Sequence, residues 1–170
     1  MELTPQRSTN LSRRLFDRLC KAEIRPPHHD ESEPSYTRSV LAPLVREELA
    51  TLPHLHLLLR GDGGSERALP ASALDIEWFP DLAVSLGPQN LWAAEVKILR
   101  PTNRQNSIAT AFGQATLYRS RYEHVAVVLI DTAPSSRLSQ EQLSADGRGL
   151  NMRVVIRPRS GKVLLEQAGG

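Results

Sequence analysis

Apolar residues gather in two runs near the middle of the chain, at 79–86 and 91–98, with Gly87-Pro88-Gln89-Asn90 between them. Glycine, proline and asparagine are the residues that tight turns require, so the pattern predicts two strands joined as a hairpin. Three charged residues interrupt the runs: Asp81, Glu95 and Lys97. The last two are two positions apart, so on a strand they point to the same face of the sheet.

The register of this hairpin decides whether the charges meet. If Leu86 pairs with Asn90, then Asp81 lies opposite Glu95 with Cβ atoms about 5 Å apart. Two carboxylates that close repel each other unless a cation lies between them. A loop one residue shorter would move Asp81 to the other face. The apolar neighbours indicate strands covered on both faces, which argues against a merely solvated charged surface. Spacing alone leaves both registers open.

Hydrophobic periodicity predicts the remaining elements. Helices are expected at 9–24, 35–52, 107–121 and 135–144, strands at 55–60, 75–86, 91–99, 124–131, 152–157 and 162–166, a turn at 61–64 and a proline- and charge-rich linker at 25–34. The strand at 124–131 is almost entirely apolar, as expected for the buried centre of a sheet. This alternation of helices and strands is typical of an α/β domain.

The helix expected at 35–52 carries an acidic residue in an unusual place. At about 100° per residue, its buried stripe consists of Leu41, Leu44, Val45, Leu49 and Leu52. Glu48 falls within that stripe and Glu47 at its edge. A carboxylate on the core-facing side of a helix needs a partner or a metal. Either Glu48 forms a salt bridge with an arginine, or it is a third acidic group beside Asp81 and Glu95; we favour the second.

Length and composition are those of one globular domain. The chain has 170 residues, of which 40% are apolar and 24% charged, and its net charge of +2 neither requires nor opposes nucleic-acid binding. We expect a single domain over 1–170, with an N-terminal helix and linker at 1–34, a core at 35–131, and a helix and hairpin at 132–170. The single Cys20 cannot form an internal disulfide, and no apolar run approaches the ~18 residues of a membrane span. A cytoplasmic protein without membrane contact is expected.

Polar and basic residues surround the helix expected at 107–121. Gln114 and Tyr118 are four positions apart and therefore neighbours on one flank of the helix. Four positive charges lie around it: Arg100, Arg104, Arg119 and Arg121. Guanidinium groups placed in this way are expected to contact the phosphates of a nucleic acid, with affinity that falls steeply with salt.

The order of these features resembles the PD-(D/E)XK nuclease superfamily. The residues that carry the resemblance are Pro80-Asp81, Glu95-Val96-Lys97 and Gln114-Ala115-Thr116-Leu117-Tyr118, the last being similar to the glutamine motif of the RecB-like exonuclease branch. The likeness spans 35 to about 131 and implies a restriction-endonuclease-like fold, with a mixed central β-sheet flanked by helices. The chain departs from the RecB-like pattern in having no clear histidine motif upstream, since His28 and His29 fall in the linker.

The resemblance implies a nuclease that hydrolyses phosphodiester bonds in DNA with Mg²⁺ or Mn²⁺. Asp81, Glu95 and the main-chain carbonyl of Val96 would hold the metal, with Glu48 holding a bound water or a second ion. Hard oxygen ligands of this kind suit either cation.

The remaining motif residues receive supporting roles from the resemblance. Lys97 would orient or help to deprotonate the attacking water, and Gln114 would position Lys97 or the scissile phosphate. Tyr118 would support the site or the nucleic-acid backbone, although packing of its helix is an equally good account. A homodimer or a subunit of a larger complex is also compatible with the superfamily.

Two alternatives stay open. The chain can be a catalytically inactive member that serves as a DNA-binding or assembly subunit. It can also be a structural α/β domain with an accidental motif, in which case the acids and Lys97 do not converge in space.

Overall fold

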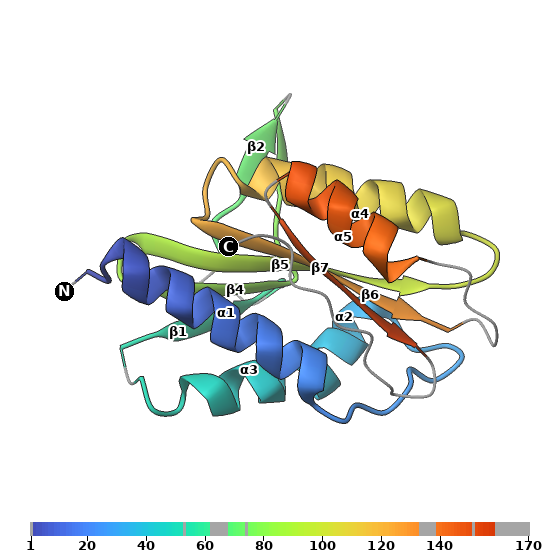
Figure 1. Cartoon of the computed structure of the whole chain (residues 1–170), viewed down its shortest axis with the longest axis horizontal. Coiled ribbons are helices and arrows are strands. Elements are labelled where there is room, and N and C mark those ends of the chain that lie inside the picture. Colours follow the sequence, from blue (N-terminus) through green and yellow to red (C-terminus); the bar gives the residue numbers. More distant parts are fainter. Residues whose placement is uncertain are drawn as a thin grey trace.

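A mixed five-stranded sheet, in the order β1-β4-β5-β6-β7, lies between two layers of helices (Figure 1). The computed structural model describes residues 2–52, 54–61, 68–73, 75–132, 139–150 and 152–158. The strands of this sheet are β1 (His56–Leu59), β4 (Leu82–Leu86), β5 (Gln89–Leu99), β6 (His124–Asp131) and β7 (Arg153–Pro158). β1, β4 and β5 are antiparallel neighbours, whereas β6 runs parallel to β5 and to β7. The α/β fold with a mixed central sheet flanked by helices is therefore confirmed.

Each face of the sheet has its own apolar core. One face is covered by α1 (Pro5–Lys21), α2 (Glu33–Tyr36), the π-helical turn η1 (Thr37–Leu41) and α3 (Ala42–Leu49); the other is covered by α4 (Arg104–Tyr118) and α5 (Gln140–Gly149). In β5, Val96 belongs to the first core, whereas Ala93 and Leu99 belong to the second. Side chains alternate along a strand, so Glu95 and Lys97 lie on the same face as Ala93, beneath α4. None of the described helices is both long and apolar enough to cross a membrane.

The helix expected at 35–52 begins earlier and is interrupted. It starts at Glu33, and within η1 the N–H of Ala42 bonds to the carbonyl of Thr37, five residues back. Pro43 follows and has no N–H to donate, so a regular α-helix cannot continue through this point. The wider turn accommodates the proline and shifts the residues before it relative to α3.

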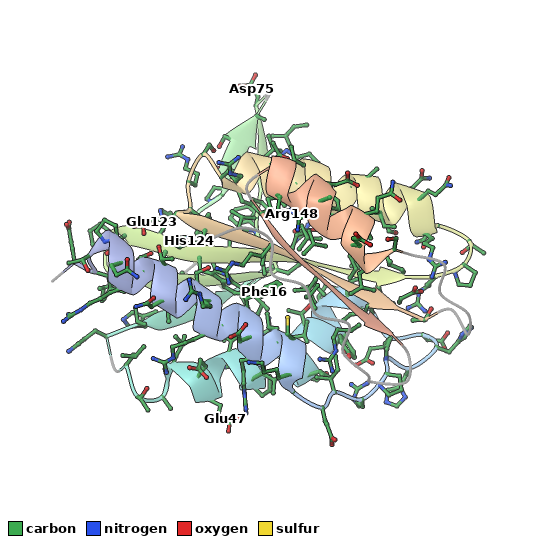
Figure 2. The ribbon with its side chains drawn as sticks, viewed as in Figure 1. Phe16, Glu47, Asp75, Glu123, His124 and Arg148 are labelled. Atoms are coloured by element: carbon green, nitrogen blue, oxygen red, sulfur yellow. The ribbon has the colours of Figure 1, made fainter. Side chains whose placement is uncertain are left out.

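The single strand expected at 75–86 is two strands in different sheets. β3 (Ile76–Trp78) pairs with β2 (Ala71–Ala73) in a separate hairpin, and the chain enters β4 only at Leu82. Asp75, with a φ of 61°, lies at the projecting tip of that hairpin (Figure 2). Pro80 lies in the break between β3 and β4, where its lack of a backbone N–H interrupts no strand pairing.

Other boundaries differ by a few residues, and some expectations cannot be compared. The strand at 124–131 has the predicted bounds, while the predicted helices at 9–24 and 107–121 correspond to α1 and α4, which begin and end earlier. α5 begins at Gln140 and overlaps only the end of the helix expected at 135–144. The strand at 162–166 and most of the turn at 61–64 lie outside the described residues.

Gly147 provides a test of the packing of α5 on β7. A Cβ at this position would lie 2.6 Å from Cγ2 of Val154 and 3.2 Å from the carbonyl oxygen of Met152. We expect Gly147→Ala to lower the free energy of unfolding by about 1–3 kcal/mol, as overpacking does. In α4, a Cβ at Gly113 meets nothing within 4 Å, so Gly113→Ala should stabilise by about 0.5–1 kcal/mol. Urea unfolding of both variants measures the difference, and equal effects would contradict the close approach.

Candidate active site

β5 extends beyond its neighbour β4, and the site lies along the edge exposed there. The pairing of β4 with β5 ends at Leu82 and Ala94, whereas the pairing of β5 with β6 continues to Leu99. Two backbone N–H groups beyond that end are bonded by carboxylates instead of a strand. The N–H of Val96 donates to Oδ2 of Asp81 at 2.8 Å, and that of Ile98 donates to Oε1 of Glu33 at 3.1 Å.

A β-bulge sets the register that places Asp81. The loop is one residue shorter than in the register that pairs Leu86 with Asn90, since Leu86 pairs with Gln89 and Ser85 with Asn90. Gly87, with a φ of 55°, occupies the loop position that requires a left-handed residue. The register then shifts between Ser85 and Val84, and Leu91 receives no cross-strand partner. The shift restores the expected pairing further along the hairpin, and Asp81 reaches the same edge as Glu95.

Glu95 and Lys97 form a buried ion pair under α4. Nζ of Lys97 lies 2.6 Å from Oε1 of Glu95 and 3.2 Å from Oε2 of Glu33. Glu95 is fully buried, and Lys97 is 8% exposed. The hydroxyl of Tyr118 donates to Oε2 of Glu95 at 2.8 Å and lies 3.0 Å from the carbonyl oxygen of Phe79. The structure therefore brings Asp81, Glu95 and Lys97 together, with Tyr118 as a direct partner.

Gln114 lies in the same helix, one turn before Tyr118. It is buried, and its Oε1 has no hydrogen-bond partner among the described residues. α4 returns from the end of β5 to the start of the parallel strand β6, so it runs against β5. Gln114 is one turn, about 5.4 Å, closer to the start of α4 than Tyr118 is. It is therefore displaced from the level of Glu95 toward that of Lys97.

Burial and mutual repulsion control the ionisation of the two acids. Burial raises the pKa of Asp81, and the hydrogen bond from the N–H of Val96 opposes that rise. Burial, together with the charge of Asp81, raises the pKa of Glu95 to about 7. Burial lowers the pKa of Lys97, but its attraction to Glu95 outweighs this and the net shift is upward. Lys97 is therefore a cation held against acids that repel each other.

Glu33 is the acidic residue that sequence reasoning missed, because it was assigned to a linker. That segment is tied to the fold: both guanidinium nitrogens of Arg25 bond to the Glu31 carboxylate at 2.6 and 2.7 Å, and Arg100 donates to backbone carbonyls of the segment. The Arg25 hydrogen bonds lower the pKa of Glu31 to about 2. A sequence signal did exist, since Ser32 caps α2 and is followed by an acid and by Pro34.

The prediction that Glu48 is the third acid is wrong. Oε1 of Glu48 lies 2.6 Å from Nη2 of Arg14 in α1, so this carboxylate joins two helices on one face of the sheet. Its neighbour Glu47 pairs with Arg18 and lies on the outer side of α3 (Figure 2). The helical stripe correctly indicated that Glu48 needs a partner, but that partner is an arginine from a neighbouring helix.

Three of the four arginines expected to contact phosphates have partners within the chain. Arg100 donates to the carbonyl oxygens of His29 and Glu31 at 2.7 and 2.8 Å, Arg104 pairs with buried Asp131, and Arg119 donates to the carbonyl oxygen of Leu150 at 2.7 Å. Arg121 is exposed. A guanidinium carries five N–H donors, and these bonds use only some of them. DNA contact by the four arginines therefore stays a prediction.

Oxygen donors for a cation come from the acids and one carbonyl. Within the described residues, no three side chains from His, Cys, Asp and Glu are grouped so as to hold a metal. Asp81 and Glu95 provide two carboxylates. In a strand the N–H and C=O of one residue point to the same edge, so the carbonyl of Val96 faces the same side as its N–H, toward Asp81.

The raised pKa of Glu95 predicts a pH-dependent stability. The folded state holds this proton more tightly than the unfolded chain, so the contribution is fully present below the ordinary pKa of 4.5 and is lost as pH rises through about 7. In chelator, Glu95→Gln should gain about 2–3 kcal/mol of stability relative to wild type as pH rises from ~4 to ~8. Chemical unfolding across this range measures the effect, with exposed Glu47→Gln as the control. Parallel profiles for wild type and Glu95→Gln would refute it.

Comparison with known proteins supplies no relative for this site. No family model, curated protein or solved structure matches the chain. Any functional assignment therefore rests on the chain's own residues: the paired acids, the lysine between Glu95 and Glu33, and the helix that covers them.

Proposed function

We propose that this chain is a metal-dependent nuclease that hydrolyses phosphodiester bonds in DNA. The observation that carries the proposal is the convergence of Asp81, Glu95 and Lys97 on one open edge of the central sheet. An ion pair adds little stability when it is buried, because desolvation offsets the Coulomb attraction. A second buried carboxylate that repels the first adds further cost, which favours a catalytic role over a structural one.

The donor set suits Mg²⁺ or Mn²⁺. Mg²⁺ is commonly held by one or two carboxylates, with waters and substrate phosphate completing its octahedron, so a third acidic side chain is not required. Asp81, Glu95 and the carbonyl of Val96 would hold it, and the repulsion between the two acids would be relieved. When bound, the cation would neutralise charge on the phosphoryl oxygens and favour ionisation of the attacking water.

Lys97 supplies the protein's positive charge at the reacting phosphate. Its raised pKa keeps Nζ protonated, which suits it to orienting water and stabilising negative charge at phosphorus. Glu33 would hold Nζ in place from the other side of the lysine, at 3.2 Å. Tyr118 would fix the rotamer of Glu95 through its hydrogen bond. Gln114, whose buried Oε1 has no hydrogen-bond partner among the described residues, would position Lys97.

The order of elements supports the narrower proposal of a restriction-endonuclease-like core. A helix ending in α3 precedes the antiparallel strands β1, β4 and β5, which are followed by α4 and the parallel strand β6. That order matches the one inferred from the PD-(D/E)XK resemblance, although the acid beside Lys97 is Glu33 and not Glu48.

A second candidate is an inactive, DNA-binding member of the same superfamily. The observation that favours it is the neutralisation of Lys97 by two carboxylates within the chain. In an active enzyme, a cation or substrate would have to compete for the carboxylates that hold Lys97. In an inactive relative, the ion pairs would persist.

Lys97→Ala tests the catalytic proposal. We expect wild type to cleave plasmid or single-stranded DNA with Mg²⁺ and not with chelator, and Lys97→Ala to lose at least about 100-fold in rate while retaining most DNA affinity. Lys21→Ala is the matched control, since that lysine pairs with Asp17 on the surface of α1. DNA binding without cleavage by the wild type would support the inactive subunit. A wild type that neither binds nor cleaves DNA would refute both candidates.

A comparison of Glu33→Gln with Glu48→Gln tests which acid serves the site. In Glu33→Gln the new amide oxygen can still accept from the N–H of Ile98, but the uncharged side chain cannot neutralise Lys97. The rate constant for cleavage should therefore fall about 10- to 100-fold, as for other residues that orient catalytic groups. Glu48→Gln should leave that rate within about 2-fold, because Glu48 contacts Arg14. The reverse ranking would restore Glu48 as the third acid.

A further inference from the structure

A small hollow lies beside Asp81 and has no role in the site described so far. Its volume is about 10 Å³, which is room for one oxygen-sized group. The lining residues are Pro34, Thr37, Arg38, Leu59, Arg60 and Asp81. They come from α2, η1, the end of β1 and the position before β4, so the hollow is built from segments that the fold brings together.

Thr37 contributes a buried hydroxyl to the hollow. The residue is 3% exposed, and its Oγ1 forms no hydrogen bond with the described part of the chain. Buried polar groups are nearly always hydrogen-bonded, because leaving one unpaired costs its full desolvation. Thr37 begins the π-helical turn, a feature that occurs frequently at functional sites. The hydroxyl therefore indicates that a ligand oxygen belongs in the hollow.

Arg60 adds a positive charge at the rim. Its Nη1 lies 3.7 Å from Oδ1 of Asp81, beyond hydrogen-bond distance, and its side chain is 48% exposed. Arg38 reaches the same place, since its Nη2 lies 3.5 Å from the carbonyl oxygen of Arg60. A hydroxyl donor and a guanidinium that line the same hollow are a suitable arrangement for one oxygen of a phosphate.

We propose that this hollow binds a non-bridging oxygen of the DNA phosphate next to the scissile one, with Thr37 and Arg60 as donors. The inference rests on the nuclease function proposed above. Asp81 connects the two places: its Oδ2 accepts from the N–H of Val96, the residue before Lys97, and its Oδ1 lies 3.7 Å from Nη1 of Arg60. A strand whose scissile phosphate is at Lys97 would therefore present a neighbouring phosphate toward Arg60. Thr37 and Arg60 are positioning residues that fix the register of the strand.

Thr37→Val separates this role from a structural one. Valine keeps the volume and removes only the hydroxyl, so the free protein should gain in Tm because an unpaired buried group is lost. The KM for DNA should rise about 10-fold while kcat stays within about 2-fold, since the lost bond helps binding and not chemistry. Thr116→Val is the control, because that hydroxyl bonds to the carbonyl of Phe112 within α4.

Arg60→Gln provides an independent readout in the same assays. Log affinity falls linearly with log salt, and loss of one phosphate contact should make this slope shallower by about one. Arg46→Gln, on the exposed side of α3, should leave the slope unchanged. If wild type cleaves or binds DNA but Thr37→Val lowers Tm and leaves KM unchanged, the hollow holds a structural water and the inference is wrong. A wild type that neither cleaves nor binds DNA overturns the nuclease proposal and this inference together.

Discussion

The unequal length of two neighbouring strands is the constraint on which the site depends. β4 ends at Leu82, and β5 continues to Leu99 with β6 on one side only. A backbone N–H left unpaired inside a protein is costly, so the open edge of β5 must find other acceptors. Asp81 and Glu33 provide them, at Val96 and Ile98. The carboxylates that complete the ladder are thereby fixed beside Lys97.

Several distant segments cooperate to maintain this edge. The 25–34 segment is held by the Arg25–Glu31 pair and by Arg100, and it delivers Glu33 at the first turn of α2. From the opposite layer, α4 delivers Tyr118 to Glu95. Arg100, which was expected to contact DNA, thus holds the scaffold, and the charge of Lys97 is neutralised within the chain by Glu95 and Glu33. Lys97 and the hydrogen bonds to Asp81 and Glu95 offset part of the repulsion between these two acids.

Much of the fold follows from short-range patterns in the sequence. The bounds of β6 follow from its continuous apolar run, and the hairpin of β4 and β5 from the turn residues at 87–90. Pro80 indicated a break but not its consequence, because the excursion through β2 and β3 depends on contacts with α4 that no local pattern encodes. The π-helical turn before Pro43 could have been foreseen, because proline has no N–H to donate, but it was not predicted.

For the site, the sequence determined which strand residues are charged and that Glu95 and Lys97 share a face, because alternation along a strand is a property of the backbone. Only the tertiary structure decided that Asp81 reaches them, since a one-residue bulge at Leu91 compensates for a shorter loop. The choice between Glu33 and Glu48 was also tertiary: periodicity states that a helical carboxylate needs a partner but not whether Arg14 or Lys97 lies within reach. Distances between separate elements arise from packing, and local sequence patterns do not determine how those elements pack.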